Sequence, residues 1–417
     1  MNALITGATI IDDCSKYHGK TVDIRIKKGV IKEIASTLKS KKGEKVIAYD
    51  SLMVSQGWFD SSVSMGEPGF EERETIANGL QVAARSGFTG VVLNANSHPV
   101  VDSNADISFL KNKSAAHALD LYPIGALTRN SDGKDLAELY DMQQAGAVAF
   151  GDYQKPINNP NLLKLALQYT QGFSGLVLSF PQENDLVGKG IVNEGEVSTN
   201  LGLKGIPALA ECLQIARDLY ILEYTGGKLH IPTISSKESV ELIRNAKDKG
   251  LDVSCSVAIS NLYFTDYMLR EFDTHFKLMP PLRTEEDRKA LVDGVKDGTI
   301  DMVCSDHNPL DIEQKKREFD HAMFGTISQE ATFGALLTLV SEKKAVQLLT
   351  AGRERFSEKG DSIEEGNLAN LTLFKTKGSH VFEEKNILSK SKNAAFLGSK
   401  LKGQVYGVIS NDQFIEA

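Results

Sequence analysis

The sequence has no excess of basic residues, no long apolar run and no basic leader segment. Lys and Arg number 47 against 55 Asp and Glu, which gives a net charge of −8. Nucleic acids and anionic membranes are bound by basic patches, so we expect neither as a partner. No apolar run approaches the roughly 20 residues of a membrane span. The first residues lack a basic n-region, so we expect no signal peptide.

Paired cysteines are also missing. The four cysteines stand singly, at Cys14, Cys212, Cys255 and Cys304. Without a Cys-x-x-Cys pair, neither a zinc ribbon nor a disulfide framework is indicated, and we expect a protein of the reducing cytoplasm. The 417 residues are 41% hydrophobic and 24% charged, a globular composition with length for two or three domains.

Both ends of the chain contain short β-strand patterns. Residues 22–26 and 30–34 alternate apolar and polar side chains around a Lys28-Gly29 turn, and residues 371–374 and 403–409 are similarly rich in β-forming residues. We therefore predict that residues 1–56 and 366–417 form one composite β-sandwich. This arrangement requires the two ends of the chain to touch.

Residues 57–365 alternate apolar runs of strand length with helical segments. Segment 236–249 is one such helix, with serine at its start and Gly250 after its end. The alternation predicts the α/β class and a parallel (β/α)8 barrel of the TIM type. A doubly wound open sheet fits the periodicity equally well. The expected strands, the first of which begins before residue 57, are 53–60, 90–94, 122–127, 147–150, 175–180, 228–233, 252–257 and 300–305.

Residues 57–69 read Gly-Trp-Phe-Asp-Ser-Ser-Val-Ser-Met-Gly-Glu-Pro-Gly. This resembles the first-strand signature of dihydroorotases, Pro-Gly-Phe-Ile-Asp-x-His-x-His-x-Arg-Glu-Pro-Gly. Further matches are Ala-Ala-Arg-Ser-Gly-Phe-Thr at 83–89, Pro-Pro-Leu-Arg at 280–283 and Ser-Asp-His-Asn-Pro at 305–309. The resemblance implies an amidohydrolase-superfamily barrel of the cyclic amidohydrolase type. It also implies the ring opening of dihydroorotate to N-carbamoyl-aspartate in pyrimidine biosynthesis, at a zinc-type metal centre.

All four positions that match the family's metal-binding histidines hold other residues. Two carboxylates persist: Asp152 matches the bridging ligand, and Asp306 matches the metal-bound general base. Hydroxyl groups are weak, neutral ligands that do not replace imidazoles. We therefore expect no metal cofactor and treat Asp306 as a vestigial general base, with a divalent metal at Asp152 and Asp306 as the alternative. The changed ligand positions are Ser62, Ser64, Pro181 and Thr233.

The substrate-binding positions implied by the resemblance are changed as well. The arginine that would grip the substrate carboxylate in a bidentate fashion is Gly66. Met279 stands where the family has the asparagine before Pro-Pro-Leu-Arg, and Leu310 stands where it has the last histidine of Asp-His-Ala-Pro-His. The candidate substrate pocket comprises Ser62, Ser64, Gly66, Asn96, Pro181, Thr233, Met279, His307 and Leu310.

Several polar residues also have plain structural explanations. Asp306 after an apolar strand is often a capping or turn residue, and His307 can simply bind neighbouring backbone. His230 is expected to be a satisfied core histidine, and His98 and His321 to be surface residues.

Three functions remain open. The first is a non-catalytic dihydroorotase-like protein with a structural or regulatory role beside aspartate carbamoyltransferase, because some members of the family have lost the same histidines. The second is an active dihydroorotase or other cyclic-amide hydrolase with an altered metal site. The third is a small-molecule sensor that uses the old pocket. The resemblance also predicts a homodimer.

Overall fold

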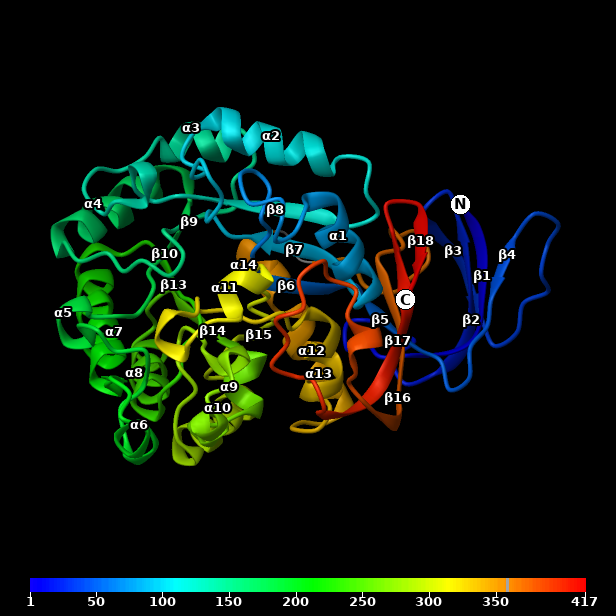
Figure 1. Cartoon of the computed structure of the whole chain (residues 1–417). Coiled ribbons are helices and arrows are strands. Elements are labelled where there is room, and N and C mark those ends of the chain that lie inside the picture. The colour runs from blue at the N-terminus through cyan, green and yellow to red at the C-terminus, as the bar shows by residue number, and fades with distance from the viewer. Residues whose placement is uncertain (358–359) are drawn as a thin grey trace.

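The protein combines a parallel barrel with a second sheet made from both ends of the chain (Figure 1); the computed structural model describes residues 1–357 and 360–417. The barrel strands are hydrogen-bonded in chain order, and each pairs with its neighbour in parallel. They are β6(Trp58–Val63), β7(Phe88–Leu93), β8(Asp120–Gly125), β9(Ala149–Phe150), β10(Leu176–Leu178), β13(Lys228–Ile231), β14(Val253–Ala258) and β15(Met302–Cys304).

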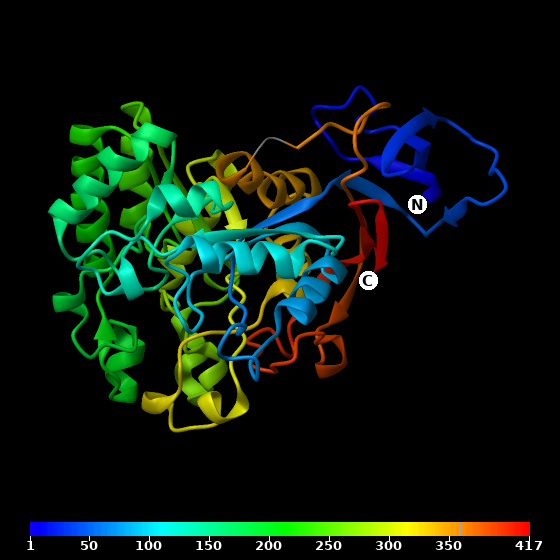
Figure 2. The same cartoon turned by 90° about the horizontal axis from the view of Figure 1, so that it is seen from above.

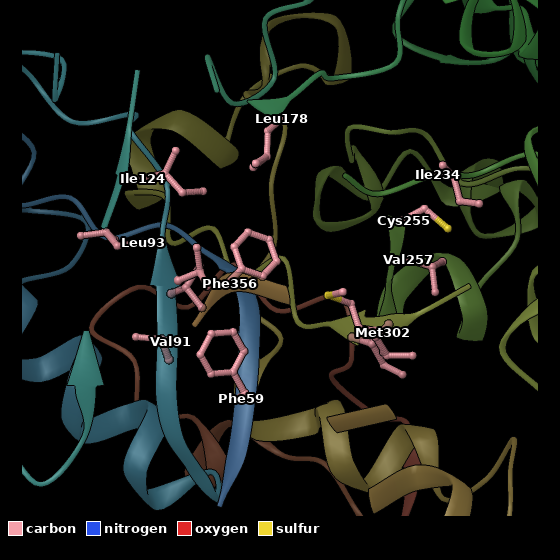
Figure 3. Packing of buried hydrophobic residues seen from close by; sticks show 14 of the residues in the cluster. Phe59, Val91, Leu93, Ile124, Leu178, Ile234, Cys255, Val257, Met302 and Phe356 are labelled. Carbon is pink, nitrogen blue, oxygen red and sulfur yellow. The ribbon is translucent and has the colours of Figure 1, made fainter. Parts of the chain in front are cut away.

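The barrel is nearly closed. β15 packs against β6, and a parallel bridge joins Val63 to His307 just after β15. A doubly wound sheet would not follow the chain order around a ring, so the predicted (β/α)8 barrel is confirmed. Buried side chains fill its interior, among them Phe59, Val91 and Met302 (Figure 3). The barrel is therefore a packed core with its openings at the two ends.

Helices surround the barrel. The predicted helix 236–249 is confirmed as α8(Lys237–Asp248), whose first turn is capped by Ser236 and which is followed by Gly250 at φ +79°. No helix in the described ranges is both long and apolar enough to cross a membrane. The remaining α-helices are α1(Ile76–Arg85), α2(Asn104–Ser114), α3(Leu139–Gln144), α4(Pro160–Thr170), α5(Asn184–Val187), α6(Glu196–Leu201), α7(Ala208–Thr225), α9(Ile259–Tyr263), α10(Glu285–Asp297), α11(Ile312–Lys315), α12(Gln329–Leu336), α13(Glu342–Thr350) and α14(Gly352–Phe356).

The two ends of the chain meet in one sheet. Its central strand β5 pairs in parallel with β1 and antiparallel with β16. The N-terminal ammonium lies 2.5 Å from the Asp412 carboxylate, and Figure 2 shows both termini beside this sheet. Its strands are β1(Asn2–Ile10), β2(Thr21–Lys27), β3(Val30–Ala35), β4(Lys45–Ile47), β5(Met53–Gln56), β16(Leu371–Val381), β17(Lys400–Ser410) and β18(Gln413–Glu416). A two-stranded sheet of β11(Val192–Asn193) and β12(Gly205–Ile206) lies apart.

The predicted strand 53–60 is wrong in one respect, because it is two strands. β5 belongs to the sheet of the chain ends and β6 to the barrel, with Gly57 between them. A Cβ at Gly57 would lie 1.9 Å from the Asn370 side-chain oxygen and 2.0 Å from the Thr89 hydroxyl. The chain passes between the two sheets through a space that admits only glycine.

Candidate functional site

A small cavity opens where the barrel strands end, the position at which barrel enzymes carry their chemistry. Four residues singled out from the sequence line it together: Ser62 on β6, Asp152 after β9, Thr233 after β13 and Asp306 after β15. The space open to the centre of a water molecule is about 20 Å³, which is room for about one water. A six-membered ring with a carboxylate does not fit this cavity.

Asp306 is half-buried at the wall of the cavity, with a left-handed backbone at φ +48°. Its carboxylate accepts a hydrogen bond of 2.9 Å from the Ser62 hydroxyl. Burial raises the pKa of Asp306 to about 7, the bond from Ser62 opposes this rise, and the negative charge of Asp60 adds to it. The described residues supply no cation that lowers the pKa.

Ser62 and Ser64, where the resemblance places two metal-binding histidines, belong to a neutral hydrogen-bond network. The Asn94 side-chain amide donates to the Ser62 hydroxyl at 3.2 Å and to the Ser64 hydroxyl at 3.3 Å. The Asn96 amide donates to Ser64 at 3.0 Å. Amide donors therefore face the hydroxyl oxygens that would have to coordinate a cation, and two N–H groups directed at Ser64 do not favour a positive ion there.

Asp152 is held by the loop after β8. One of its carboxylate oxygens accepts from the Thr128 N–H at 3.0 Å, and the other accepts from the Thr128 hydroxyl at 2.5 Å. Burial raises the pKa of Asp152, and these hydrogen bonds partly oppose the shift. Both oxygens thus already have a structural partner.

Tyr153 and Gln154, which directly follow Asp152, are among the residues of the cavity wall that the sequence reasoning missed. The Tyr153 hydroxyl is buried and has no hydrogen-bond partner among residues 1–357 and 360–417, and burial together with the charge of Asp306 raises its pKa. Gln154 donates to the Met279 carbonyl oxygen at 2.8 Å. Met279 itself does not line the cavity, so its part in the site is a backbone contact.

The other predicted pocket residues lie outside the cavity lining. Pro181 follows Phe180, which lines the wall, and Leu310 is buried with its N–H bonded to Asn393 at 3.1 Å. Gly66 is closed in by backbone, since a Cβ there would lie 1.8 Å from the Phe70 carbonyl oxygen. The arginine of the family signature has no room at this position.

Two of the histidines are buried and hydrogen-bonded, and two lie on the surface. The His307 ring nitrogen Nδ1 accepts from the backbone N–H groups of Ser328 and Gln329, at 3.2 and 3.4 Å. His230 is buried between the hydroxyls of Ser254 and Ser256. Burial lowers the pKa of His307 and of His230 to about 3. His98 and His321 are exposed, as expected.

These side chains do not fit the zinc-type centre that the resemblance implies. In residues 1–357 and 360–417, no group of three or more His, Cys, Asp or Glu side chains could hold a metal ion. Such a centre takes nitrogen, sulfur or carboxylate ligands in a set of four or more. Asp152 and Asp306 are two, and the remaining polar groups at the mouth are hydroxyls and amides.

Comparison with known proteins gives consistent matches along the chain. Residues 51–239 match the family described as Dihydro-orotase-like. The dihydroorotase of Geotalea daltonii is 38% identical and covers 97% of this chain and 96% of its own. The dihydroorotase of Pelotomaculum thermopropionicum is 39% identical, over 98% of this chain and 97% of its own.

Among solved structures, the L-hydantoinase (dihydropyrimidinase) of Arthrobacter aurescens is similar over 100% of this chain and 96% of its own, with a TM-score of 0.86 and 18% identity. The D-hydantoinase of a Thermus species has a TM-score of 0.83 and 20% identity, over 99% and 94%. At such identities the likeness concerns the fold alone. It agrees with a TIM barrel accompanied by a sheet domain.

Proposed function

Because the chain belongs to the dihydroorotase family, we propose that it serves pyrimidine biosynthesis as a dihydroorotase-like protein that does not itself hydrolyse dihydroorotate. We assign it a structural or regulatory role beside aspartate carbamoyltransferase in the cytoplasm. The observation that carries the proposal is the neutral hydroxyl and amide network around Ser62 and Ser64, at the positions of two metal ligands.

The chemistry of ring opening supports this proposal. Hydrolysis of a cyclic amide needs a strongly activated water, a base to move its proton, and a group that holds the substrate carboxylate. Asp306 is suited to only one of these roles, that of the base. Gly66 leaves no space for the carboxylate-binding arginine, and the cavity has space for about one water. A small-molecule sensor would need space for its ligand, and the cavity at the ends of the barrel strands is too small to provide it.

The names of the relatives favour the second candidate, an active metal-dependent dihydroorotase or another cyclic-amide hydrolase. Relatives that match nearly the whole chain are called dihydroorotase, and they support retained activity better than its loss. Asp306 adds to this candidate, because a carboxyl with a pKa of about 7 is well suited to act as a base at neutral pH. An active site would require the mouth to rearrange around both a cation and the substrate.

Metal content and turnover of the purified full-length chain separate the two candidates. After purification without chelators, we expect far less than one equivalent of zinc, manganese or cobalt per chain. We also expect no hydrolysis of dihydroorotate above the uncatalysed rate, with or without added Zn²⁺. Stoichiometric metal together with turnover that Asp306→Ala abolishes would establish the active enzyme. The Asp293→Ala variant, which removes an exposed carboxylate on α10, controls for loss of charge alone.

The role beside the transferase has its own test. We expect sedimentation of the protein mixed with aspartate carbamoyltransferase from the same organism to reveal a complex at micromolar concentrations. Transferase that sediments unchanged would count against this role, whatever the metal analysis gives.

A further inference from the structure

Positive charge is concentrated in one part of this acidic chain. Between residues 375 and 402 the sequence holds seven lysines and two glutamates, an excess of five positive charges, whereas the whole chain carries a net charge of −8. A local surface of the opposite sign can attract anions that the rest of the chain repels. The net charge, on which the expectation of no basic patch rests, conceals this cluster of lysines.

The lysine-rich segment forms a two-stranded ribbon that extends past the rest of its sheet (Figure 1). β16 pairs with β5 only through residues 371–374, and β17 pairs with β18 only through residues 407–410. Beyond these residues the two strands continue to pair with each other, with Ser379 opposite Lys402. The ribbon therefore presents lysines from both strands away from the centre of the sheet.

A bulge interrupts the pairing within the ribbon. Lys375 lies opposite Gln404 and Ser379 opposite Lys402, so three residues of β16 face Gly403 alone. Gly403 has φ +67°, and a Cβ there would lie 2.5 Å from the Lys375 carbonyl oxygen, so this position admits only glycine. Bulges bend a strand and redirect its side chains, often beside functional sites.

A hollow of about 530 Å³ lies against the bulge. Its lining comes from β16, from β17 and from the short helical turn η6(Glu384–Asn386). A smaller hollow of about 140 Å³ shares His380, Asn386 and Gln404 with it and reaches to α1 and α12. The two together are the β16–β17 hollow, whose basic residues are Arg85, Lys375, Lys377, His380, Lys385 and Lys402.

Four of these basic residues carry charges that no acidic side chain neutralises directly. Lys377 and Lys402 are exposed, and Arg85 and Lys375 are half-buried. Among residues 1–357 and 360–417, none of the four forms an ion pair, whereas Lys385 pairs with Glu383. Like charges around one hollow repel each other, and a bound anion would remove this repulsion.

The two carboxylates that line the β16–β17 hollow offset little of its positive charge. Glu383 is taken up by Lys385. The Glu330 side chain is 5% exposed, and one of its oxygens accepts from the N–H groups of Leu388 and Ser389, at 3.1 and 3.0 Å. Burial raises the pKa of Glu330, which disfavours its negative charge. The four unpaired cations therefore set the sign of the field in the hollow.

Lysines on an exposed strand also have a plain structural explanation, because they discourage edge-to-edge pairing between chains. This explanation covers Lys375 and Lys377 on β16. It does not account for Arg85 from α1, Lys385 from η6 and Lys402 from β17, which border the same space. Cations that converge from four elements of the fold indicate a ligand rather than protection of one edge.

The number and type of these cations indicate the class of ligand. Lysine binds phosphate as a point charge, and a chain of two or three phosphates presents several negative charges to cations that lie side by side. A volume of about 530 Å³ is in the range of small-molecule sites. Ser379, Asn386 and Gln404 offer hydrogen bonds to further polar groups.

We infer that the β16–β17 hollow binds a small metabolite that carries a diphosphate or a triphosphate. The inference rests on this surface and not on the state of the barrel mouth, so it holds for an active and for an inactive protein.

Isothermal titration calorimetry of the full-length chain with inorganic triphosphate, in magnesium-free buffer of low ionic strength, tests it. Wild-type protein is expected to bind one equivalent with a dissociation constant below ~1 mM. The double variant Lys377→Glu/Lys402→Glu is expected to bind at least ~10-fold more weakly, since two attractions become repulsions. Salt at ~0.5 M should weaken binding to the wild type, because it screens exposed charges.

The matched control is Lys289→Glu/Lys296→Glu on α10, which changes the net charge equally at side chains that are 69% and 52% exposed. It is expected to bind triphosphate as the wild type does. Circular dichroism checks that each variant is folded, and Lys377→Gln/Lys402→Gln replaces the charge reversal if that variant is not. Parallel titration with ATP separates two sources of the phosphates. Equal affinity assigns recognition to the phosphate chain, and tighter binding of ATP adds a contact to its nucleoside.

Three outcomes overturn the inference. The first is the absence of saturable binding of either compound at ~5 mM. The second is equal weakening in both charge-reversed variants, which would reduce the effect to net charge. The third is inorganic phosphate that binds as tightly as triphosphate, which would exclude a polyphosphate as the specific ligand. The proposed function would stand after each of them, because its tests measure metal content, turnover and binding to the transferase.

Discussion

Asp306→Asn is expected to stabilise the folded protein, with a gain that grows between pH 4 and pH 7 and then levels off. The asparagine keeps an oxygen that accepts the 2.9 Å bond from Ser62 and removes the charge that burial disfavours. At pH 8 we expect an increase of roughly 2–4 kcal/mol in the free energy of unfolding, since each unit of pKa shift corresponds to about 1.4 kcal/mol. Urea denaturation at pH 5, 6, 7 and 8 measures it.

The sign of this change in the free energy of unfolding follows from the pKa values of the Asp306 carboxyl in the folded and unfolded protein. In the folded protein the pKa of Asp306 is raised to about 7 by burial, whereas an unfolded aspartate titrates near ~3.9. Between these values the unfolded chain has lost the proton and the folded chain still holds it. The contribution of Asp306 to stability is therefore complete below pH ~4 and is lost as the pH rises through 7. The lower end of the expected gain in the free energy of unfolding applies because Asp306 is only half-buried.

A bound metal ion would reverse this result. A cation next to Asp306 would lower its pKa, and removing the carboxylate would then weaken both the metal site and the fold. A loss of stability in Asp306→Asn at pH 8 would thus favour the active enzyme over the proposed function. Asp293→Asn on the exposed side of α10 is the control and should show no gain that depends on pH.

The strands of the barrel could be predicted from the sequence because each is a short apolar run between polar segments. The division at Gly57 could not, since β5 and β6 form one uninterrupted run in the sequence. It follows from Asn370 and Thr89, which come from distant parts of the chain and close on Gly57 only in the folded protein.

The candidate site could be predicted in part. From the resemblance to dihydroorotases, Ser62, Asp152 and Asp306 could be predicted as site residues, and all three line one cavity. It gave no reason to include Tyr153 or Asn94, because their roles depend on where the side chains turn after the strand ends.

The second large effect is expected at Gly66, where the resemblance places a substrate-binding arginine. Gly66→Ala should lower the free energy of unfolding by about 3 kcal/mol, the upper part of the range for a side chain forced into filled space. Its Cβ would lie 1.8 Å from the Phe70 carbonyl oxygen. Gly66→Arg should be more severe and yield little folded protein.

The loop around Gly66 is held by several hydrogen bonds, so it cannot easily move to make space for a side chain. The Gly66 N–H donates to the Glu74 carbonyl oxygen at 2.9 Å, and the Phe70 N–H returns to the Gly66 carbonyl oxygen at 2.8 Å. Glu74 is fully buried, and its carboxylate accepts from the Ser389 hydroxyl and the Lys390 N–H, both at 2.9 Å. Moving Phe70 away from Gly66 therefore strains a loop that is anchored to the C-terminal part of the chain.

Chemical denaturation of Gly66→Ala and of Gly172→Ala measures the effect, because a Cβ at Gly172 meets no atom within 4 Å. The Gly172 variant should match wild type within about 0.5 kcal/mol, as surface substitutions usually do. If Gly66→Ala is equally stable, the loop can open to accept a side chain. An arginine could then be introduced there, and the active-hydrolase candidate would gain the carboxylate-binding group that the described structure leaves no room for.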